Sequence, residues 1–296
     1  MPDAAFAVDG VHRPVSIRID RWGVAHIRAE TAADAFFAQG WNAARDRLWQ
    51  IDLWRKRGLG LLARDFGPAY AEKDAAARLF LYRGDMDAEW RCYGPNAKPW
   101  TEAFVAGINA YLDGIAAGRH PLPPEFRLMG TEPDRWRAED VVRIRSHARV
   151  HNLDHEVRRS AVLADFGPAA DSLRKARQPD RPLETPAGFE PAVLPPEILA
   201  TYLRGTEPAS FGAGEVETAA HPSELLGSNA WALAPERTTT GRPILASDPH
   251  RAHQMPSLRH MVHLQAPGLD VIGAGEPCVP GVSFGHNQDI AFGLTI

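Results

Sequence analysis

The sequence predicts an α+β protein in which the helices come first along the chain and the strands come last. Over residues 1–177, apolar side chains recur mainly at the three- and four-residue spacing of amphipathic helices. Over residues 228–296, short runs of strand-forming residues alternate with Gly, Pro and Asn. Between these regions, residues 178–227 carry too many Pro and Gly residues for long regular elements, so we predict a linker or a removable spacer there.

A β-hairpin is expected near the start of the chain. Val15, Ile17 and Ile19 alternate with polar residues, which is the two-residue period of a half-buried strand. The dipeptide Trp22-Gly23 offers a turn before a second strand over residues 24–29.

A long helix is predicted after this hairpin. Thr31 with Asp34 three positions later resembles a helix-capping arrangement, and Gly58 with Gly60 is expected to end the helix. Trp41 belongs to the apolar face, so we expect it to pack in the core rather than to bind a ligand. That face comprises Phe37, Trp41, Ala44, Leu48, Ile51 and Trp54. A polar face with ion pairs inside the helix is predicted for Arg45, Asp46, Arg47 and Asp52.

The same patterns predict the remaining elements. Helices are expected over residues 101–115 and over residues 138–166, the latter interrupted near Asn152, and a short helix is expected over residues 198–203. Six strands are predicted after Gly227, and their close spacing favours antiparallel pairing. They span residues 229–234, 243–246, 258–264, 269–272, 282–285 and 290–295.

Composition narrows the class of protein. The 296 residues carry a net charge of −4 on interspersed acidic and basic side chains, so we expect no nucleic acid partner. Cys92 and Cys278 are too few and too far apart for a disulfide framework or a cysteine metal site. No apolar run reaches the roughly 18 residues of a membrane span, and the first residues do not resemble a signal peptide. We therefore expect no membrane contact and a cytoplasmic protein, or a periplasmic or secreted one where an export signal is removed.

The dipeptide Gly227-Ser228 is the strongest candidate for chemistry, because it stands where the spacer meets the strands. A serine hydroxyl is a weak nucleophile at neutral pH and needs a base within hydrogen-bonding reach. If the bond between the two residues is cut, the new α-amine has an ordinary pKa of about 7.7 to 8.0 and can accept the hydroxyl proton, directly or through water. The same hydroxyl could make the cut by attacking the Gly227 carbonyl. An ordinary turn into a strand is the alternative interpretation.

Several motifs occur in a fixed order on both sides of the spacer. Before it come RIDRWGVAHIRAET, DAFFAQGWNAARDRLWQIDLWRKRGLGLLARDFG, FVAGINAYLDG, LPPEFRLMG and EPDRWRAED. After it come GSNAWALAPERTTTGRPILASDPHR, HLQAPGLDVIGAGEPCVPGVSFGHN and IAFGLT. Together they resemble the penicillin acylase (penicillin amidase) family of N-terminal nucleophile hydrolases. The resemblance implies an αββα sandwich built from an α- and a β-subunit, which arise from one precursor by autocatalytic cleavage.

The resemblance implies an amide hydrolase and assigns roles near the junction by position. The enzyme would remove the acyl group from N-acylated small molecules such as β-lactams or N-acyl homoserine lactones. Ser228 would be the nucleophile and the new N-terminus, and Asn229 would help to hold its strand. His250 falls where relatives carry a His or Gln beside the nucleophile. Ile296 falls where a backbone N–H contributes to the oxyanion hole.

The resemblance also implies a substrate pocket and a metal site. The acyl pocket would draw on Ser146, Arg149 and Val150, and on the segment that contains Arg251, which could attract a carboxylated acyl chain. Glu156 resembles the α-subunit carboxylate that binds a structural calcium in several relatives. No cofactor is expected for catalysis itself.

The chain departs from the family pattern in its length. It ends at Ile296, soon after Ser228, whereas the β-subunits of the family are much longer. By the resemblance, the side-chain Asn of the oxyanion hole and the remaining calcium ligands would be expected beyond Ile296. We expect a precursor truncated at its C-terminus that is weakly active or inactive on its own. The alternative is a non-catalytic fragment that keeps only the acyl-binding surface.

Metal-dependent hydrolysis is a more distant alternative. Asp248 with His250, and His260 with His263, contain side chains of the type that binds metals. Residues three apart in a strand point to opposite faces, however, so His260 and His263 should not bind the same ion. The dipeptide His286-Asn287 is expected to form a turn rather than a site.

Overall fold

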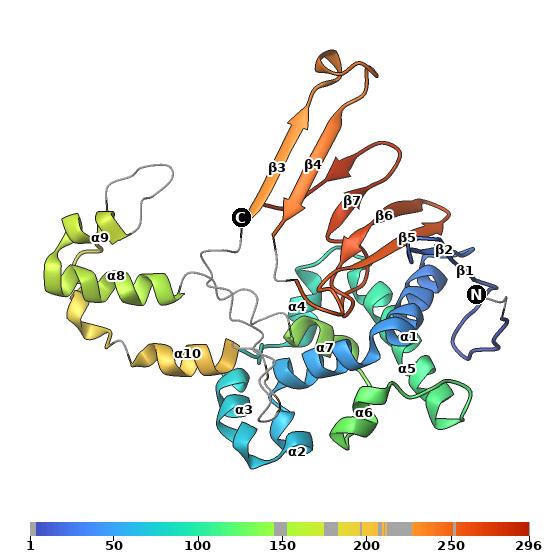
Figure 1. Ribbon diagram of the computed structural model, residues 1–296, viewed down its shortest axis with the longest axis horizontal. Coiled ribbons are helices and arrows are strands. Elements are labelled where there is room, and N and C mark those ends of the chain that lie inside the picture. Colours follow the sequence, from blue (N-terminus) through green and yellow to red (C-terminus); the bar gives the residue numbers. More distant parts are fainter. Residues whose placement is uncertain are drawn as a thin grey trace. The chain divides into compact units, whose positions relative to one another are not determined.

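The structure, a computed structural model, divides the chain into two units. Unit 1 holds residues 1–56, 83–142 and 210–296, and unit 2 holds residues 57–82 and 143–209. The described residues are 4–144, 153–174, 183–195, 197–206, 209, 211, 227–250 and 253–295. Helices predominate before Gly227 and strands after it, as Figure 1 shows, so the predicted α+β class with a largely helical N-terminal region is confirmed.

A six-stranded sheet in unit 1 joins the two ends of the sequence. Its strand order is β1-β2-β5-β6-β7-β8. The strands are β1 (Ser16–Ile19), β2 (Ala25–Arg28), β5 (His260–Ala266), β6 (Leu269–Gly275), β7 (Phe284–His286) and β8 (Ala291–Phe292). The N-terminal hairpin and the antiparallel pairing of β5 to β8 are confirmed. In addition, β2 pairs with β5 in parallel, with His26 opposite His263, a contact that local patterns do not predict.

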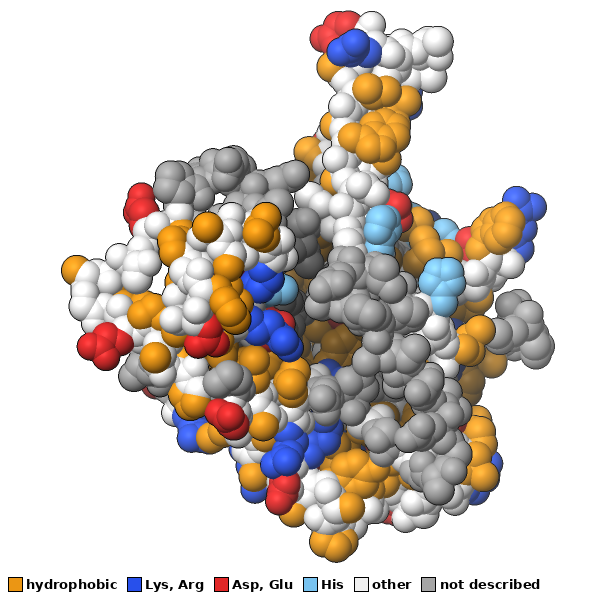
Figure 2. Space-filling view, turned by 60° about the vertical axis from the view of Figure 1, so that its left-hand side comes forward, with side chains coloured by type: hydrophobic (Ala, Val, Ile, Leu, Met, Phe, Trp, Pro, Cys, Tyr) orange, Lys and Arg blue, Asp and Glu red, His pale blue; other side chains and the backbone are white. Residues whose placement is uncertain are grey.

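A separate two-stranded ribbon in unit 1 consists of β3 (Ser228–Leu233) and β4 (Ile244–Pro249). The strands are antiparallel, and their register runs from Ser228 opposite Pro249 to Leu233 opposite Ile244. Much of the ribbon is exposed: Trp231, for example, is 53% exposed. Figure 2 shows the ribbon projecting at the top with exposed hydrophobic side chains, and histidine side chains near its base.

Helix α1 (Ala32–Leu59) begins and ends much as predicted. The Thr31 hydroxyl donates to the Asp34 carboxylate (2.8 Å) and accepts from the Asp34 N–H (3.1 Å), so the predicted cap is confirmed. Gly58 lies inside the helix, and Gly60 follows its last residue with a φ of 66°, a conformation that glycine adopts without strain. The other helices of unit 1 are α4 (Met86–Arg91), α5 (Ala97–Ala116), α6 (Pro124–Met129) and α7 (Ala138–Arg143), the last ending in unit 2.

Helices α1 and α5 approach each other through two glycines. A Cβ atom on Gly40 would lie 1.9 Å from the Phe104 carbonyl oxygen, and one on Gly107 would lie 1.9 Å from the Phe37 carbonyl oxygen. Only glycine fits at either position, because real Cβ atoms do not come so close to a neighbour. Trp41 is 8% exposed beside this contact, so its predicted place in the core is confirmed.

Helix α1 also bends, which its apolar periodicity does not predict. The bend is at Arg47, whose φ of −140° and ψ of 21° are not helical. The side chains of Arg47 and Gln50 both donate to the carbonyl oxygen of Ser257, at 2.9 and 3.0 Å. The bend thus lies where α1 contacts the segment that precedes β5.

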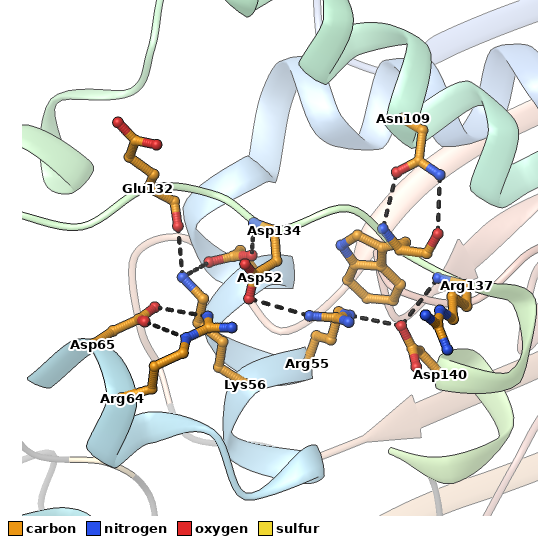
Figure 3. Close-up of polar contacts among 11 residues, drawn as sticks. Asp52, Arg55, Lys56, Arg64, Asp65, Asn109, Glu132, Asp134, Arg137 and Asp140 are labelled. Carbon is orange, nitrogen blue, oxygen red and sulfur yellow. Dashed lines mark hydrogen bonds and ion pairs between the residues drawn. The ribbon is translucent and has the colours of Figure 1, made fainter.

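Asp52 belongs to the predicted polar face of α1, but it is buried. Its side chain is 1% exposed and pairs with Lys56, one turn later, at 2.7 Å. Residues 132–140 cover this side of the helix: Lys56 Nζ donates to the Glu132 carbonyl (2.7 Å) and Arg55 Nε donates to Asp140 (2.7 Å; Figure 3). The predicted ion pairing within the helix is nevertheless confirmed.

Unit 2 is helical in its described part. It contains α2 (Leu62–Phe66), α3 (Ala71–Arg78), α8 (Leu153–Phe166), α9 (Pro168–Arg174) and α10 (Ile198–Thr206), with short 3-10 turns at Pro68–Tyr70 and Pro191–Val193. Helix α10 confirms the short helix predicted inside the Pro- and Gly-rich region. The helix predicted over residues 138–166 corresponds to α7 and α8, and the residues between them lie outside the described part. No helix among the described residues is long and apolar enough to cross a membrane.

Candidate active site

Ser228 is the first residue of β3, and the hydrogen bonding of the ribbon extends one step beyond it. The backbone N–H of His250 donates to the carbonyl oxygen of Gly227 over 2.8 Å. This bond follows from the antiparallel register, because Gly227 precedes β3 where His250 follows β4. The ladder therefore fixes the carbonyl group of the Gly227-Ser228 bond and brings His250 beside it.

The hydroxyl of Ser228 contacts a residue from the end of the chain. Ser228 Oγ donates to Thr295 Oγ1 over 3.1 Å, and Thr295 Oγ1 donates to the Ser228 carbonyl oxygen, also over 3.1 Å. Thr295 follows β8, which contacts β4. Gly293 makes this approach possible, because a Cβ there would lie 2.5 Å from the side chain of Ser247 in β4.

The imidazole of His250 is oriented by its neighbours in the ribbon. Nε2 lies 2.9 Å from a carboxylate oxygen of Asp248 and 3.4 Å from the amide nitrogen of Asn229. A carboxylate only accepts hydrogen bonds, so we assign the proton of the neutral ring to Nε2 and the lone pair to Nδ1. Nδ1 lies on the Gly227 side, since a Cβ on Gly227 would be 3.4 Å from it. The His250 side chain is 43% exposed, so solvent screens its pairing with Asp248.

The arrangement has the chemistry that acyl transfer requires. A serine hydroxyl, a carbonyl held by a backbone donor and an imidazole lie within one strand pair, next to the end of a third strand. A family model described as penicillin amidase matches residues 14–296. The chain belongs to the penicillin amidase family. The resemblance predicted from the ordered motifs is therefore confirmed.

Two curated relatives match along nearly the whole chain. Penicillin acylase 2 proenzyme of Pseudomonas sp. (strain SE83) is 36% identical over 98% of this chain and 37% of its own length. Acyl-homoserine lactone acylase QuiP of Pseudomonas aeruginosa is 29% identical over 98% of this chain and 34% of its own length. The chain thus spans little more than a third of the length of these relatives.

A solved structure of a thermostable penicillin G acylase from Alcaligenes faecalis is also similar. Its TM-score is 0.48 and its sequence identity 23%, covering 60% of this chain and 99% of that one.

Five residues that the family resemblance singles out lie outside the described residues. They are the oxyanion candidate Ile296 and the substrate-pocket candidates Ser146, Arg149, Val150 and Arg251. Their roles stay predictions. Thr295 and Asp248, which contact Ser228 and His250, were not predicted as site residues, although both stand in motifs shared with the penicillin amidase family.

Glu156, the predicted calcium ligand, lies in the first turn of α8 in unit 2. Its carboxylate accepts a hydrogen bond from Arg159 (2.6 Å) and is 58% exposed, and Arg159 also pairs with Asp171 (2.9 Å). Calcium takes six to eight oxygen ligands. The described residues contain no group of three His, Cys, Asp or Glu side chains that could hold a metal ion. Among the described residues Glu156 is thus a single carboxylate paired with a guanidinium, which does not by itself make a calcium site. The calcium role of Glu156 stays a prediction.

The remaining histidines take separate partners. His260 Nε2 lies 3.6 Å from Asp46 in α1, whereas His263 Nε2 lies 2.8 Å from Asp270 in β6. His263 also contacts His26 across the parallel strand pair, with 3.0 Å between their Nδ1 atoms. His260 and His263 therefore do not share a site, as strand alternation predicts.

The dipeptide His286-Asn287 forms the predicted turn. The Asn287 side-chain oxygen accepts from the backbone N–H groups of Asp289 (2.8 Å) and Ile290 (2.7 Å). This is the Asx-type turn that asparagine favours, and it connects β7 to β8.

Proposed function

We propose that this chain carries the nucleophile of an acylase, an amide hydrolase that removes the acyl group from N-acylated small molecules. Membership of the penicillin amidase family supports this class of reaction. The names of the two curated relatives point to penicillins and acyl-homoserine lactones as substrates of those proteins. For this chain we propose the shared chemistry, an acyl group on the nitrogen of a small molecule.

The observation that carries the proposal is the pair of contacts on the two sides of the Gly227-Ser228 bond. The carbonyl oxygen of Gly227 accepts from the His250 N–H, while the hydroxyl of Ser228 is held by Thr295. A backbone N–H at a carbonyl oxygen stabilises the negative charge that develops there during nucleophilic attack. We propose that Ser228 attacks this carbonyl and cuts its own chain.

The proposed self-cleavage has two steps. In the first, Ser228 Oγ forms a bond to the Gly227 carbonyl carbon, the carbon–nitrogen bond breaks, and the hydroxyl proton goes to the Ser228 nitrogen. In the second, water opens the resulting ester, leaving a carboxylate on Gly227 and a free amine on Ser228. The products are an α-chain that ends before Ser228 and a β-chain that begins with it, and we propose that they form a heterodimer.

Turnover of a substrate repeats this chemistry with a new base. The free α-amine of Ser228 has an ordinary pKa near 8 and takes the hydroxyl proton as Oγ attacks the acyl carbon of the substrate. The amine product leaves, and water hydrolyses the acyl-serine ester. We propose that His250, oriented by Asp248, lies beside this centre, and that the backbone N–H of Ile296 is an oxyanion donor.

Mass analysis and acylase assays test the proposal together. The protein from the whole reading frame that contains this chain is produced as wild type, as Ser228→Ala and as Ser172→Ala, the last changing an exposed serine of unit 2. We expect a species that begins at Ser228, and release of acyl groups from penicillins or N-acyl homoserine lactones, for wild type and Ser172→Ala only. An intact, inactive wild-type protein would contradict the proposal and favour a non-catalytic acyl-binding protein.

A further inference from the structure

Thr295 contacts Ser228 twice through one atom. Its hydroxyl oxygen accepts from Ser228 Oγ and donates to the Ser228 carbonyl oxygen, each over 3.1 Å. The two bonds join the side chain and the backbone of Ser228 to a single group. Rotation about the Cα–Cβ bond of Ser228 would break the first bond, so Thr295 favours one of the three staggered rotamers.

The rotamer of Ser228 decides whether its hydroxyl faces the bond that is to be cut. Few covalent bonds separate Ser228 Oγ from the Gly227 carbonyl carbon. With the backbone fixed in β3, the distance between these two atoms depends on rotation about the Cα–Cβ bond of Ser228. The Gly227 carbonyl is held independently by the N–H of His250. We propose that Thr295 is the positioning residue of the reaction, holding the Ser228 hydroxyl in one rotamer while the β3–β4 ladder fixes the neighbouring Gly227 carbonyl. This inference rests on the proposed function and adds to it the residue that orients the nucleophile.

The chemistry of threonine suits positioning rather than proton transfer. Its hydroxyl has no tendency to ionise near neutral pH, and in this geometry its own proton is already donated to the Ser228 carbonyl. The hydroxyl proton of Ser228 therefore ends on the nitrogen of Ser228 during self-cleavage, and Thr295 keeps its proton throughout. Threonine is also stiff about its Cα–Cβ bond because it is branched at Cβ, so its hydroxyl is held in a defined direction.

The size of the expected effect follows from the exposure of the contact. Thr295 is exposed and Ser228 is half-buried, so water competes for both hydroxyl groups. A neutral hydrogen bond contributes a modest net free energy under such conditions. We therefore expect loss of the Thr295 hydroxyl to slow self-cleavage by about 3- to 10-fold rather than to abolish it.

The test measures the rate of self-cleavage in the protein made from the whole reading frame. Newly synthesised chains are labelled briefly in a cell-free translation system, and the decay of the intact chain is followed by gel electrophoresis and mass analysis. Thr295→Val removes the hydroxyl with little change in shape, and Thr295→Ser keeps it. Thr240→Val is the matched control, since Thr240 is an exposed threonine in the loop of the same ribbon, and its hydroxyl hydrogen-bonds to Thr238 and to the N–H of Arg242.

The expected order is slow cleavage for Thr295→Val and a rate within about twofold of wild type for both Thr295→Ser and Thr240→Val. Urea unfolding is measured in the Ser228→Ala background, where the chain is not cut. The free energy of unfolding should be similar for Thr295→Val, Thr295→Ser and Thr240→Val. Equal slowing by Thr295→Val and Thr295→Ser, or no slowing by either, would overturn the positioning role. If Thr295→Val fails to fold, Thr295→Ala takes its place and the comparison with Thr295→Ser decides.

The same series separates this inference from the proposed function. Normal cleavage of Thr295→Val alongside an uncut Ser228→Ala protein overturns only the role of Thr295. A wild-type protein that is never cut before Ser228 overturns the proposed function, and the inference with it.

Discussion

The backbone N–H of His250 and the carbonyl oxygen of Gly227 lie 2.8 Å apart and form a hydrogen bond just beyond the paired residues of β3 and β4. Any sequence that folds with this register holds the carbonyl before Ser228 against a fixed donor, whatever residue other than proline stands at position 250. The family resemblance predicts that His250 lies beside Ser228. The antiparallel register of β3 and β4 explains this position, because it places His250 opposite Gly227. Position 250 thus contacts Gly227 through its backbone N–H, independently of its imidazole.

The contact between α1 and α5 should tolerate no side chain at Gly107. Gly107→Ala would place a Cβ 1.9 Å from the Phe37 carbonyl oxygen, so the helices must separate. We expect a loss of about 3 kcal/mol in the free energy of unfolding, measured with urea. Gly94→Ala is the matched control, because no atom lies within 4 Å of a Cβ there, and it should change stability by less than about 1 kcal/mol. Equal effects of the two variants would contradict the close packing.

The buried pair of Asp52 and Lys56 should be sensitive to loss of one partner. Burial raises the pKa of Asp52, and the charge of Lys56 opposes this rise. Lys56→Met leaves the carboxylate buried without its cation, and we expect stability to fall by about 3 kcal/mol at pH 7. Because the pKa of Asp52 is raised in the folded protein, ionisation of Asp52 costs stability as pH rises. The stability lost on the Lys56→Met substitution should therefore be smaller at pH 5 than at pH 7.

Urea unfolding of Lys56→Met at pH 7 and pH 5 measures both expectations. Arg135→Met is the control, since Arg135 pairs with Asp113 at the surface, where the side chains are 64% and 55% exposed. An exposed pair contributes less than about 1 kcal/mol. A Lys56→Met effect as small as that of Arg135→Met, or one that grows at pH 5, would contradict the account.

Asp46 should give the protein a stability that is lost in acid. Burial by itself raises the pKa of Asp46, but pairing with His260 and Arg45 outweighs burial and lowers the pKa from 3.8 to about 2. Because the folded pKa lies below the unfolded one, the contribution is complete above about pH 4 and disappears as pH falls through about 2. Because Asp46 is partly exposed and solvent screens its ion pairs, the contribution at neutral pH is at most about 2 kcal/mol.

The test compares the unfolding free energy of wild type and Asp46→Asn between pH 6 and pH 2.5. The difference should be at most about 2 kcal/mol at pH 6 and should narrow steadily below pH 4. Asp289→Asn, at an exposed aspartate, should not show this dependence. A difference between wild type and Asp46→Asn that stays constant across the range would disprove the lowered pKa.

Local patterns predicted the elements better than their partners. The Thr31 cap, the N-terminal hairpin and α10 follow from side chains a few residues apart, which is why the sequence alone could place them. The parallel pairing of β2 with β5 could not be predicted, because it joins segments that are distant in sequence. Burial of Asp52 was missed for a similar reason, since residues 132–140 cover it.

The candidate site shows the same division. Ser228 stood out through its position at a change of pattern and through a family resemblance. Thr295 could be found only through the fold, because β8 must return to the ribbon before its hydroxyl meets Ser228. The motif IAFGLT contains Gly293, whose lack of a side chain lets the backbone lie close to Ser247. A glycine in the sequence does not show, however, which neighbouring residue such a close approach brings into contact with Ser228.

The most direct test of the central claim is the N-terminus of the β-chain. Intact-mass analysis and N-terminal sequencing of the protein from the whole reading frame should find a chain that begins Ser228-Asn229-Ala230, and none when Ser228 is replaced by Ala. A wild-type protein that remains uncut at this bond, or a Ser228→Ala protein that is cut there at the wild-type rate, would contradict the claim that Ser228 cuts its own chain to become the nucleophile.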